Sequence, residues 1–159
     1  MLEFHSMTFG YGKKVLFDGL DLKLEPGSIF GLLGLNGAGK TTLLKRPVGA
    51  LRPQGGSISC FGRNPGERGA AGLADLVFVP EDPWVPALTQ KSWLKRYAAF
   101  RPGFDTAYFE RLAEDLALDR DKVLTKYSYG QRKKFALAAA LASGARTLLL
   151  DEPTNGLDI

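Results

Sequence analysis

Hydrophobic and polar residues alternate in the first part of the chain, before a continuous apolar stretch begins. From Leu20 to Leu24 every second residue is a leucine between polar neighbours, which is the period of a half-buried strand. The tripeptide Glu-Pro-Gly at 25–27 predicts a tight turn, because proline fixes φ and glycine permits a positive φ. Residues 29–33 carry no polar side chain, as in a strand buried on both faces. Further strands are predicted at 56–61 and 76–79.

Helical signals follow in two places. One helix is predicted to open near Gly39, after a glycine-rich loop, and Pro47 should end or kink it by removing a backbone donor. A second helix carries apolar residues at i, i+3, i+4 and i+7 from Phe109 to Leu116, with Asp105 placed to cap its start.

The last part of the chain predicts a helix followed by a strand. The helix runs from about Tyr129 to Ser143 and stops at Gly144. The apolar run Thr147–Leu150 is again typical of a fully buried strand, and it ends on Asp151. This order of elements indicates an α/β domain with a mostly parallel sheet and a helical insertion.

Composition narrows the class of protein. With 159 residues, 45% hydrophobic and 24% charged, the chain matches one ordinary globular domain. No apolar run reaches the ~18 residues of a membrane span, and the first residues do not form a secretory signal. The single cysteine, Cys60, excludes an internal disulfide, so we expect a cytoplasmic protein. The net charge of +4 suits polyphosphate, nucleic acid or an anionic membrane surface without choosing among them.

A phosphate-loop motif stands after the first apolar stretch. Residues Gly34 to Thr41 satisfy G-x-x-x-x-G-K-[ST] at every fixed position. Glycines let backbone N–H groups surround phosphate oxygens, Lys40 can reach the outer phosphates, and the Thr41 hydroxyl can ligate Mg²⁺. A glycine-rich turn could match by accident, but this one follows an apolar stretch and opens a predicted helix. We predict nucleotide contacts from Gly34, Asn36, Gly37, Ala38, Gly39, Lys40, Thr41 and Thr42.

Two carboxylates, Asp151 and Glu152, follow the last predicted strand. Ligands of open α/β sheets lie beyond the carboxyl ends of the strands, so these acids should face the phosphate loop. Asp151 would hold Mg²⁺, and Glu152 would orient or deprotonate the attacking water. An isolated acidic pair would be read as a turn, but beside a complete phosphate loop the metal and catalytic roles are favoured. Glu152 and Lys40 are therefore the predicted catalytic residues.

These motifs together resemble the ABC ATPase family, the motor subunits of ATP-binding cassette transporters. The turn and strand at 51–58 are similar to those that family members carry after the phosphate loop. Ser128-Tyr129-Gly130-Gln131 resembles the signature L-S-G-G-Q, and 151–158 matches D-E-P-T-x-x-L-D. The resemblance covers essentially the whole chain.

The resemblance implies a P-loop NTPase, RecA-like core with an N-terminal antiparallel β region and a helical insertion, incomplete at the C-terminus. Within one nucleotide-binding domain over 1–159, it implies three parts. These are the β region and phosphate-loop core at 1–80, a Q-loop-like segment with the helical subdomain at 81–143, and the Walker B strand and D-loop at 144–159.

The resemblance also implies cofactors and partners. ATP and Mg²⁺ would be sandwiched in a head-to-tail dimer, where Ser128, Gly130 and Gln131 contact the γ-phosphate held by a second subunit. Asp158 would lie at that interface. Tyr11 sits where the family stacks an aromatic ring on adenine, although a lone tyrosine before a turn would otherwise be read as surface packing.

The chain departs from the family pattern at the signature and at the Q-loop. Tyr127 and Tyr129 replace the leucine and first glycine of the signature, which puts the helix start in question. Glu81 stands where most members have glutamine, and it can still ligate a hard cation such as Mg²⁺. This glutamate and the segment 100–105 resemble a branch of bacterial exporter-type ATPases.

The chain ends at Ile159, before the segment in which family members carry a switch histidine, and its single histidine is His5. We therefore expect a C-terminally truncated domain that hydrolyses ATP poorly. The resemblance implies a transport motor, an exporter, working with a transmembrane permease on the inner face of the cell membrane, with no nucleic acid. The alternatives are a soluble ABC-type ATPase acting on nucleic acid or the ribosome, and a regulatory module with little turnover.

Overall fold

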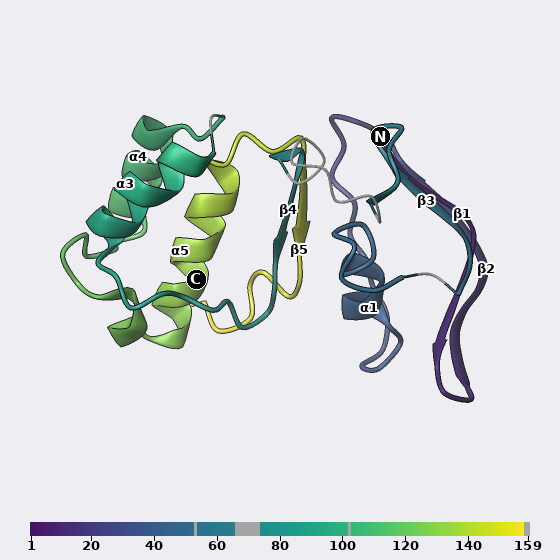
Figure 1. Ribbon diagram of the computed structural model, residues 1–159. Helices are drawn as coiled ribbons and strands as arrows, with labels where there is room; N and C mark the ends of the chain where they lie inside the picture. Colours follow the sequence, from purple (N-terminus) through teal and green to yellow (C-terminus); the bar gives the residue numbers. More distant parts are fainter. Residues whose placement is uncertain (53, 66–73, 102, 158–159) are drawn as a thin grey trace. The chain divides into compact units, whose positions relative to one another are not determined.

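The computed structural model describes residues 1–52, 54–65, 74–101 and 103–157. The chain forms two compact units, Met1–Leu73 and Ala74–Ile159. Helices and strands occur in both units (Figure 1). Among the described residues, no helix is long and apolar enough to cross a membrane.

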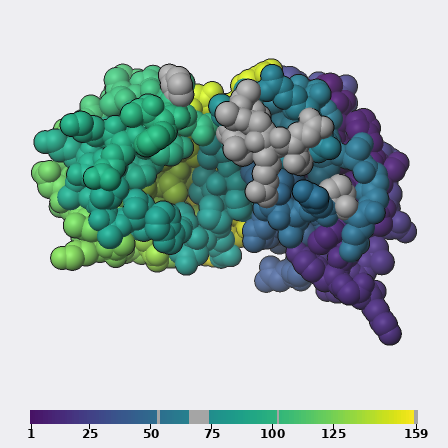
Figure 2. Space-filling model, viewed as in Figure 1, coloured from purple at the N-terminus to yellow at the C-terminus, as the bar shows by residue number. Residues whose placement is uncertain are grey.

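The first unit contains a three-stranded antiparallel sheet in the order β2-β1-β3. Its strands are β1 (Leu2–Tyr11), β2 (Lys14–Leu24) and β3 (Gly55–Cys60), so the strand predicted at 56–61 is confirmed. Leu2 faces Leu24 on one side and Cys60 on the other. The end of the β1–β2 hairpin stands out from its unit in purple (Figure 2).

The predicted alternation in β2 is confirmed, since the three leucines at its end are half-buried and the residues between them are exposed. Four side chains of β1 form most of the core of this unit, joined by one residue of α1 (Lys40–Leu44) and one of β3. These core residues are Leu2, Phe4, Met7, Phe9, Leu43 and Ile58.

The strand predicted at 29–33 is wrong. After the predicted turn, in which Gly27 has φ +75°, this segment has no regular secondary structure. Ile29 and Leu33 are 102% and 93% exposed. An apolar run is buried as a strand only where both faces of its sheet are covered by other elements. The sheet of the described first unit is antiparallel and consists of β2, β1 and β3 without this segment.

Helix α1 is the predicted helix after the glycine-rich loop. It spans only five residues and ends at Leu44. The Arg46 amide turns back to the Leu43 carbonyl at 3.2 Å, and buried Pro47 cannot donate the next bond. The prediction that Pro47 ends this helix is therefore confirmed.

In the described part of the second unit, two parallel strands, β4 (Leu76–Val79) and β5 (Thr147–Leu150), pair with each other and are accompanied by helices. The helices are α3 (Gln90–Phe100), α4 (Thr106–Asp115) and α5 (Tyr129–Leu141), with a short 3₁₀ helix at Leu124–Lys126. All three helices lie on the same side of the strand pair within this unit (Figure 1). Of the last strand only Leu149 is buried, so the strand is confirmed but its full burial is not.

The predicted helix ends are largely confirmed. The Asp105 carboxylate caps α4 by accepting from the Tyr108 amide at 2.8 Å. Helix α5 begins at Tyr129 as predicted and ends two residues earlier, before Gly144 with φ +69°. Helix α3 was not predicted, although Thr89 caps it by accepting from the Ser92 amide.

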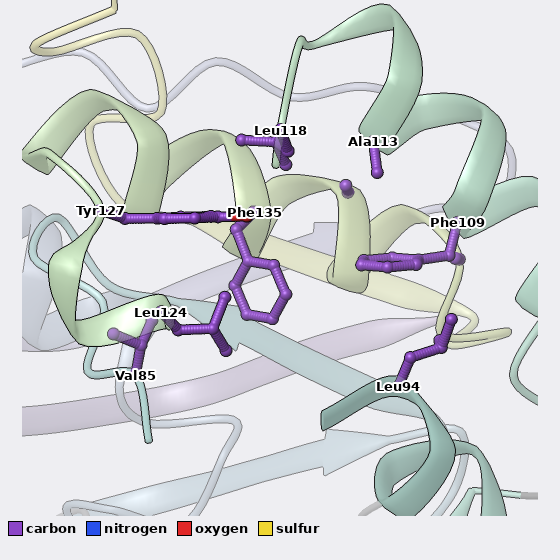
Figure 3. Packing of buried hydrophobic residues seen from close by; sticks show 10 residues of the cluster. Val85, Leu94, Phe109, Ala113, Leu118, Leu124, Tyr127 and Phe135 are labelled. Atoms are coloured by element: carbon purple, nitrogen blue, oxygen red, sulfur yellow. The ribbon is translucent and has the colours of Figure 1, made fainter. Parts of the chain in front are cut away.

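An aromatic cluster forms the core of the second unit. Phe135 of α5 points into the middle of the buried side chains (Figure 3). Its ring lies 5.9 Å from the ring of Phe109 and 4.7 Å from that of Trp93, between ring centroids, with edge-to-face geometry. Burying each such side chain contributes roughly 1.5–3 kcal/mol. This packing holds α3, α4 and α5 against one another.

Candidate functional site

The phosphate loop runs directly into α1 in the first unit. Gly37 and Gly39 have φ of +79° and +98°, a region that side chains other than glycine rarely adopt. A Cβ at Gly39 would lie 2.9 Å from the Phe17 ring of β2. Glycine is therefore required at 39 both by its backbone and by the strand that packs against it.

Lys40 folds back across this loop. Its Nζ donates to the carbonyl oxygen of Gly34 at 2.8 Å, so the ammonium group lies over the stretch between the two fixed glycines of the motif. Within the loop, the Ala38 amide donates to the Leu35 carbonyl at 3.1 Å. The predicted contacts from Gly34 to Thr42 thus form a loop, exposed from Gly34 to Ala38, and the first residues of α1, with a cation held across the loop.

Tyr11 is placed beside this loop at the end of β1. Its hydroxyl lies 3.4 Å from Thr42 Oγ1, and its ring meets the Phe9 ring edge-on with centroids 4.9 Å apart. The side chain is 53% exposed. Two residues predicted for nucleotide binding, one aromatic and one in the helix, are therefore neighbours although 31 positions separate them.

Arg46 is a buried cation that the sequence analysis missed. Its guanidinium carbon lies 3.3 Å from the centre of the Phe9 ring, on which Tyr11 also packs. Its Nε and both Nη atoms make no hydrogen bond within the part of the chain that the structure describes. Burial lowers the pKa of Arg46, partly offset by nearby Tyr11. No local pattern in the sequence signals this stacking, because it depends on which strand becomes the neighbour of the residues after α1.

The acidic residues lie at one edge of the parallel strand pair in the second unit. Val79 and Leu150 are partners at the carboxyl ends of β4 and β5, and the Asp151 amide donates to the Val79 carbonyl at 2.9 Å. Glu81 therefore follows one strand, and Asp151 and Glu152 follow its neighbour. Parallel strands end on the same side, so the three carboxylates belong to the same edge.

The two acids after β5 differ in their surroundings. Asp151 is buried, whereas Glu152 is exposed and adopts φ +46°. For a residue other than glycine this left-handed backbone costs roughly 1–2 kcal/mol. Such strain gathers at functional sites, where the surrounding structure holds it. The chain reverses direction immediately after the predicted metal ligand, and this turn carries the predicted catalytic carboxylate.

The start of α5 is built by a capping box. Ser128 Oγ accepts from the Gln131 amide at 3.2 Å, and Gln131 Oε1 accepts from the Ser128 amide at 3.1 Å. A Cβ at Gly130 would approach the Gly156 carbonyl oxygen to 2.9 Å, which explains the glycine. The two tyrosines in the signature-like segment therefore leave the helix start intact.

Tyr127 takes the position of an apolar residue and adds polar contacts. It is buried, and its hydroxyl donates to the Asp119 carbonyl at 2.6 Å, with Gln90 Oε1 at 3.1 Å. Burial, helped by Asp119, raises the pKa of Tyr127 to about 12. The ring also lies edge-on to Phe135, so the residue before the cap is anchored in the aromatic core.

The predicted metal ligands do not form a protein cage. No group of three or more His, Cys, Asp or Glu side chains that could hold a metal ion occurs within the described ranges. Mg²⁺ commonly takes only one or two carboxylates and completes its shell with water and phosphate. Thr41 belongs to the first unit and Glu81 and Asp151 to the second. Asp158, predicted at a dimer interface, lies outside the described residues.

Comparison with known proteins gives the same family over most of the chain. A family model described as ABC transporter matches residues 17–155. The bacitracin transport ATP-binding protein BcrA of Enterococcus faecalis is 33% identical, over 99% of this chain and 52% of its own length. The Nod factor export ATP-binding protein I of Paraburkholderia xenovorans is 35% identical, over 99% of this chain and 54% of its own. The chain thus spans about half the length of these curated relatives.

Solved structures support the fold. The ATP-binding subunit of an ABC transporter superposes with a TM-score of 0.87 at 27% identity, covering 99% of this chain and 68% of that one. A bacterial Atm1-family ABC exporter with ATP bound gives 0.82 at 26% identity, over 99% and 30%. The predicted P-loop NTPase fold with an antiparallel β region is confirmed. The chain belongs to the ABC transporter family, as one of its ATP-binding domains.

Proposed function

We propose that this chain binds and hydrolyses Mg·ATP as the motor subunit of an ABC transporter that exports its substrate. The observation that carries the proposal is the phosphate loop, with Lys40 Nζ held across it at 2.8 Å from the Gly34 carbonyl. Phosphate oxygens would replace that carbonyl as the acceptor. The loop amides and Lys40 would then bind the β- and γ-phosphates, and Tyr11 would stack on adenine.

The acidic edge would supply the metal ligands and the base. Mg²⁺, held by the Thr41 hydroxyl with Asp151 and Glu81, would neutralise charge on the phosphates. Glu152, exposed at the reversal of the chain after β5, would orient the attacking water and accept its proton. Lys40 would stabilise the negative charge that develops on the transferred phosphoryl group.

The start of α5 supports a role in a head-to-tail dimer. Ser128, Gly130 and Gln131 form a capped helix start, and Ser128 is exposed. In such a dimer these residues would contact the γ-phosphate bound by the second subunit, with Asp158 at the interface. A helix start carries unpaired N–H donors, which suit a phosphate.

The exporter assignment and the cellular location rest on relatives. The names of two relatives describe bacitracin transport and Nod factor export, and one similar structure is an exporter with ATP bound. By analogy, we propose a transmembrane permease as partner and a peripheral location on the cytoplasmic face of the cell membrane. A regulatory module with little turnover is the second candidate, because Glu81 stands where most members of the family have glutamine.

Calorimetry of this chain with Mg·ATP tests the nucleotide site. Lys40→Ala should weaken ATP binding by more than about tenfold, because charge-assisted hydrogen bonds contribute roughly 1.5–3 kcal/mol each. Lys13→Ala, which removes an exposed lysine in the β1–β2 turn, is the control and should bind normally. Normal affinity in Lys40→Ala would contradict the proposed site. Binding by the wild type without measurable hydrolysis would favour the regulatory candidate.

A further inference from the structure

The main-chain carbonyl and the side-chain carboxylate of Glu81 both accept hydrogen bonds from segments that are far away in the sequence. Its main-chain carbonyl accepts from the Tyr129 hydroxyl at 2.8 Å and from Lys133 Nζ at 2.7 Å. Its carboxylate accepts from Asn155 Nδ2 at 2.7 Å. One residue therefore joins the segment after β4, the first turns of α5 and the turn after β5.

Lys133 is a buried lysine whose ammonium group makes a specific hydrogen bond. Its side chain is fully buried on α5, in line with Ala140 seven residues further along and away from the helix face that carries Phe135. A buried ammonium is costly unless its hydrogen bonds are made. Its Nζ binds the Glu81 carbonyl and lies 3.5 Å from the Tyr129 hydroxyl. The hydrogen bond to the Glu81 carbonyl therefore explains why a lysine is tolerated at this buried position.

Tyr129 also packs against the turn that contains Asn155. Its ring packs so closely on Gly156 that a Cβ at that position would overlap the ring, and Gly156 has φ +74°. Gly156 in turn lies against Gly130 of the same helix. The tyrosine that departs from the signature pattern therefore places the turn after β5 against the start of α5. This placement brings Asn155 to the Glu81 carboxylate.

We propose that Tyr129, Lys133 and Asn155 are positioning residues for Glu81, two of them holding its backbone and the third aiming its carboxylate. The proposal rests on the proposed function, in which the Glu81 carboxylate faces the metal. A side chain that is already held loses less freedom when it meets a ligand, and each immobilised side chain is worth about a two- to tenfold change in affinity. The contacts would make Glu81 an adequate replacement for the usual glutamine.

Amide hydrogen exchange on the nucleotide-free chain tests the positioning directly. Tyr129→Phe and Asn155→Ala should speed exchange at 81–85 and 152–157 by several-fold, while the middle of α5 stays protected. The controls are Tyr108→Phe on α4 and Thr154→Ala in the same turn, which remove side-chain groups outside these contacts and should leave exchange unchanged. Wild-type exchange in both test variants would overturn the proposal.

A titration with Mg²⁺ at fixed ATP separates positioning from a merely structural role. Asn155→Ala should raise the Mg²⁺ concentration for half-maximal nucleotide binding about two- to tenfold, with unchanged affinity for ATP in excess chelator. Faster exchange with an unchanged Mg²⁺ requirement would overturn the positioning role. If wild-type binding proves independent of Mg²⁺, the proposed metal role of Glu81 fails and the inference falls with it.

Lys133 is tested by a matched pair on the same helix. Lys133→Met keeps the apolar stem but leaves the Glu81 carbonyl with one donor fewer, so exchange at 81–85 should rise. Lys134→Met, one position further and half-buried, should leave that exchange unchanged. Equal exchange in the two variants would remove Lys133 from the proposal.

Discussion

The two units of this protein build their candidate functional residues in different ways. The phosphate loop in the first unit is a contiguous stretch in which glycine backbone and one lysine do the work. In the second unit, Glu81, Tyr129 and Asn155 come from three separate segments and meet through side chains. A contiguous backbone site can be read as a motif, whereas a site assembled by packing depends on contacts that no local pattern records.

The largest expected effect separates binding from turnover. Glu152→Gln removes the proposed base but keeps the size of the side chain, so hydrolysis should slow by about 10²–10⁴-fold. ATP affinity, which the first unit supplies in this scheme, should stay near the wild-type value. A radiolabelled phosphate-release assay beside calorimetry measures both quantities. Unchanged turnover would show that the second unit does not provide the base through Glu152.

A glycine substitution probes the backbone-built unit. Gly39→Ala should lower the free energy of unfolding by roughly 2–4 kcal/mol, because φ +98° is unfavourable and the new Cβ meets Phe17. Gly12→Ala in the β1–β2 turn is the matched control. It shares a positive φ of +57° but has no atom within 4 Å of its Cβ, so it should cost only about 1 kcal/mol. Equal losses in urea unfolding would show that the Phe17 contact is unimportant.

A cap substitution probes the side-chain-built unit. Ser128→Ala should lower the free energy of unfolding by about 1 kcal/mol, because the Gln131 amide loses its acceptor. Ser92→Ala, in the first turn of α3, keeps the Thr89 cap of that helix and serves as the control. Thermal unfolding followed by circular dichroism measures both. A Ser128→Ala protein as stable as the wild type would mean that packing of Tyr127 and Phe135 alone places the start of α5.

The smallest expected effect is a pH dependence. The folded state holds the Tyr127 proton up to a pKa of about 12, whereas the unfolded chain releases it near the ordinary value of about 10. Between these values the unfolded state binds fewer protons, so the stability falls as pH rises. Tyr127→Phe should make the decline shallower in that window. An identical slope in urea unfolding at pH 9 to 11.5 would contradict the burial of this hydroxyl.

The fold and site were predictable where short-range chemistry dominates. The turn at 25–27, the cap at Asp105 and the end of α1 before Pro47 follow from the local preferences of proline, glycine and aspartate. The position of the acidic residues at one edge of the strand pair was also predictable, because parallel strands have their carboxyl ends on the same side of a sheet. The missed helix α3 shows the limit of this reading. Its cap at Thr89 lies beside no clean apolar stripe, and much of its packing comes from aromatic contacts with α4 and α5.

The sequence by itself determined the phosphate loop, the acidic pair and the capped start of α5, because each is specified by residues within a few positions of one another. Tertiary structure decided the rest. It left the apolar run at 29–33 exposed and stacked Arg46 on Phe9. It also brought Asn155 to Glu81. Burial and long-range hydrogen bonds depend on which segments become neighbours, and hydrophobicity drives that choice without direction.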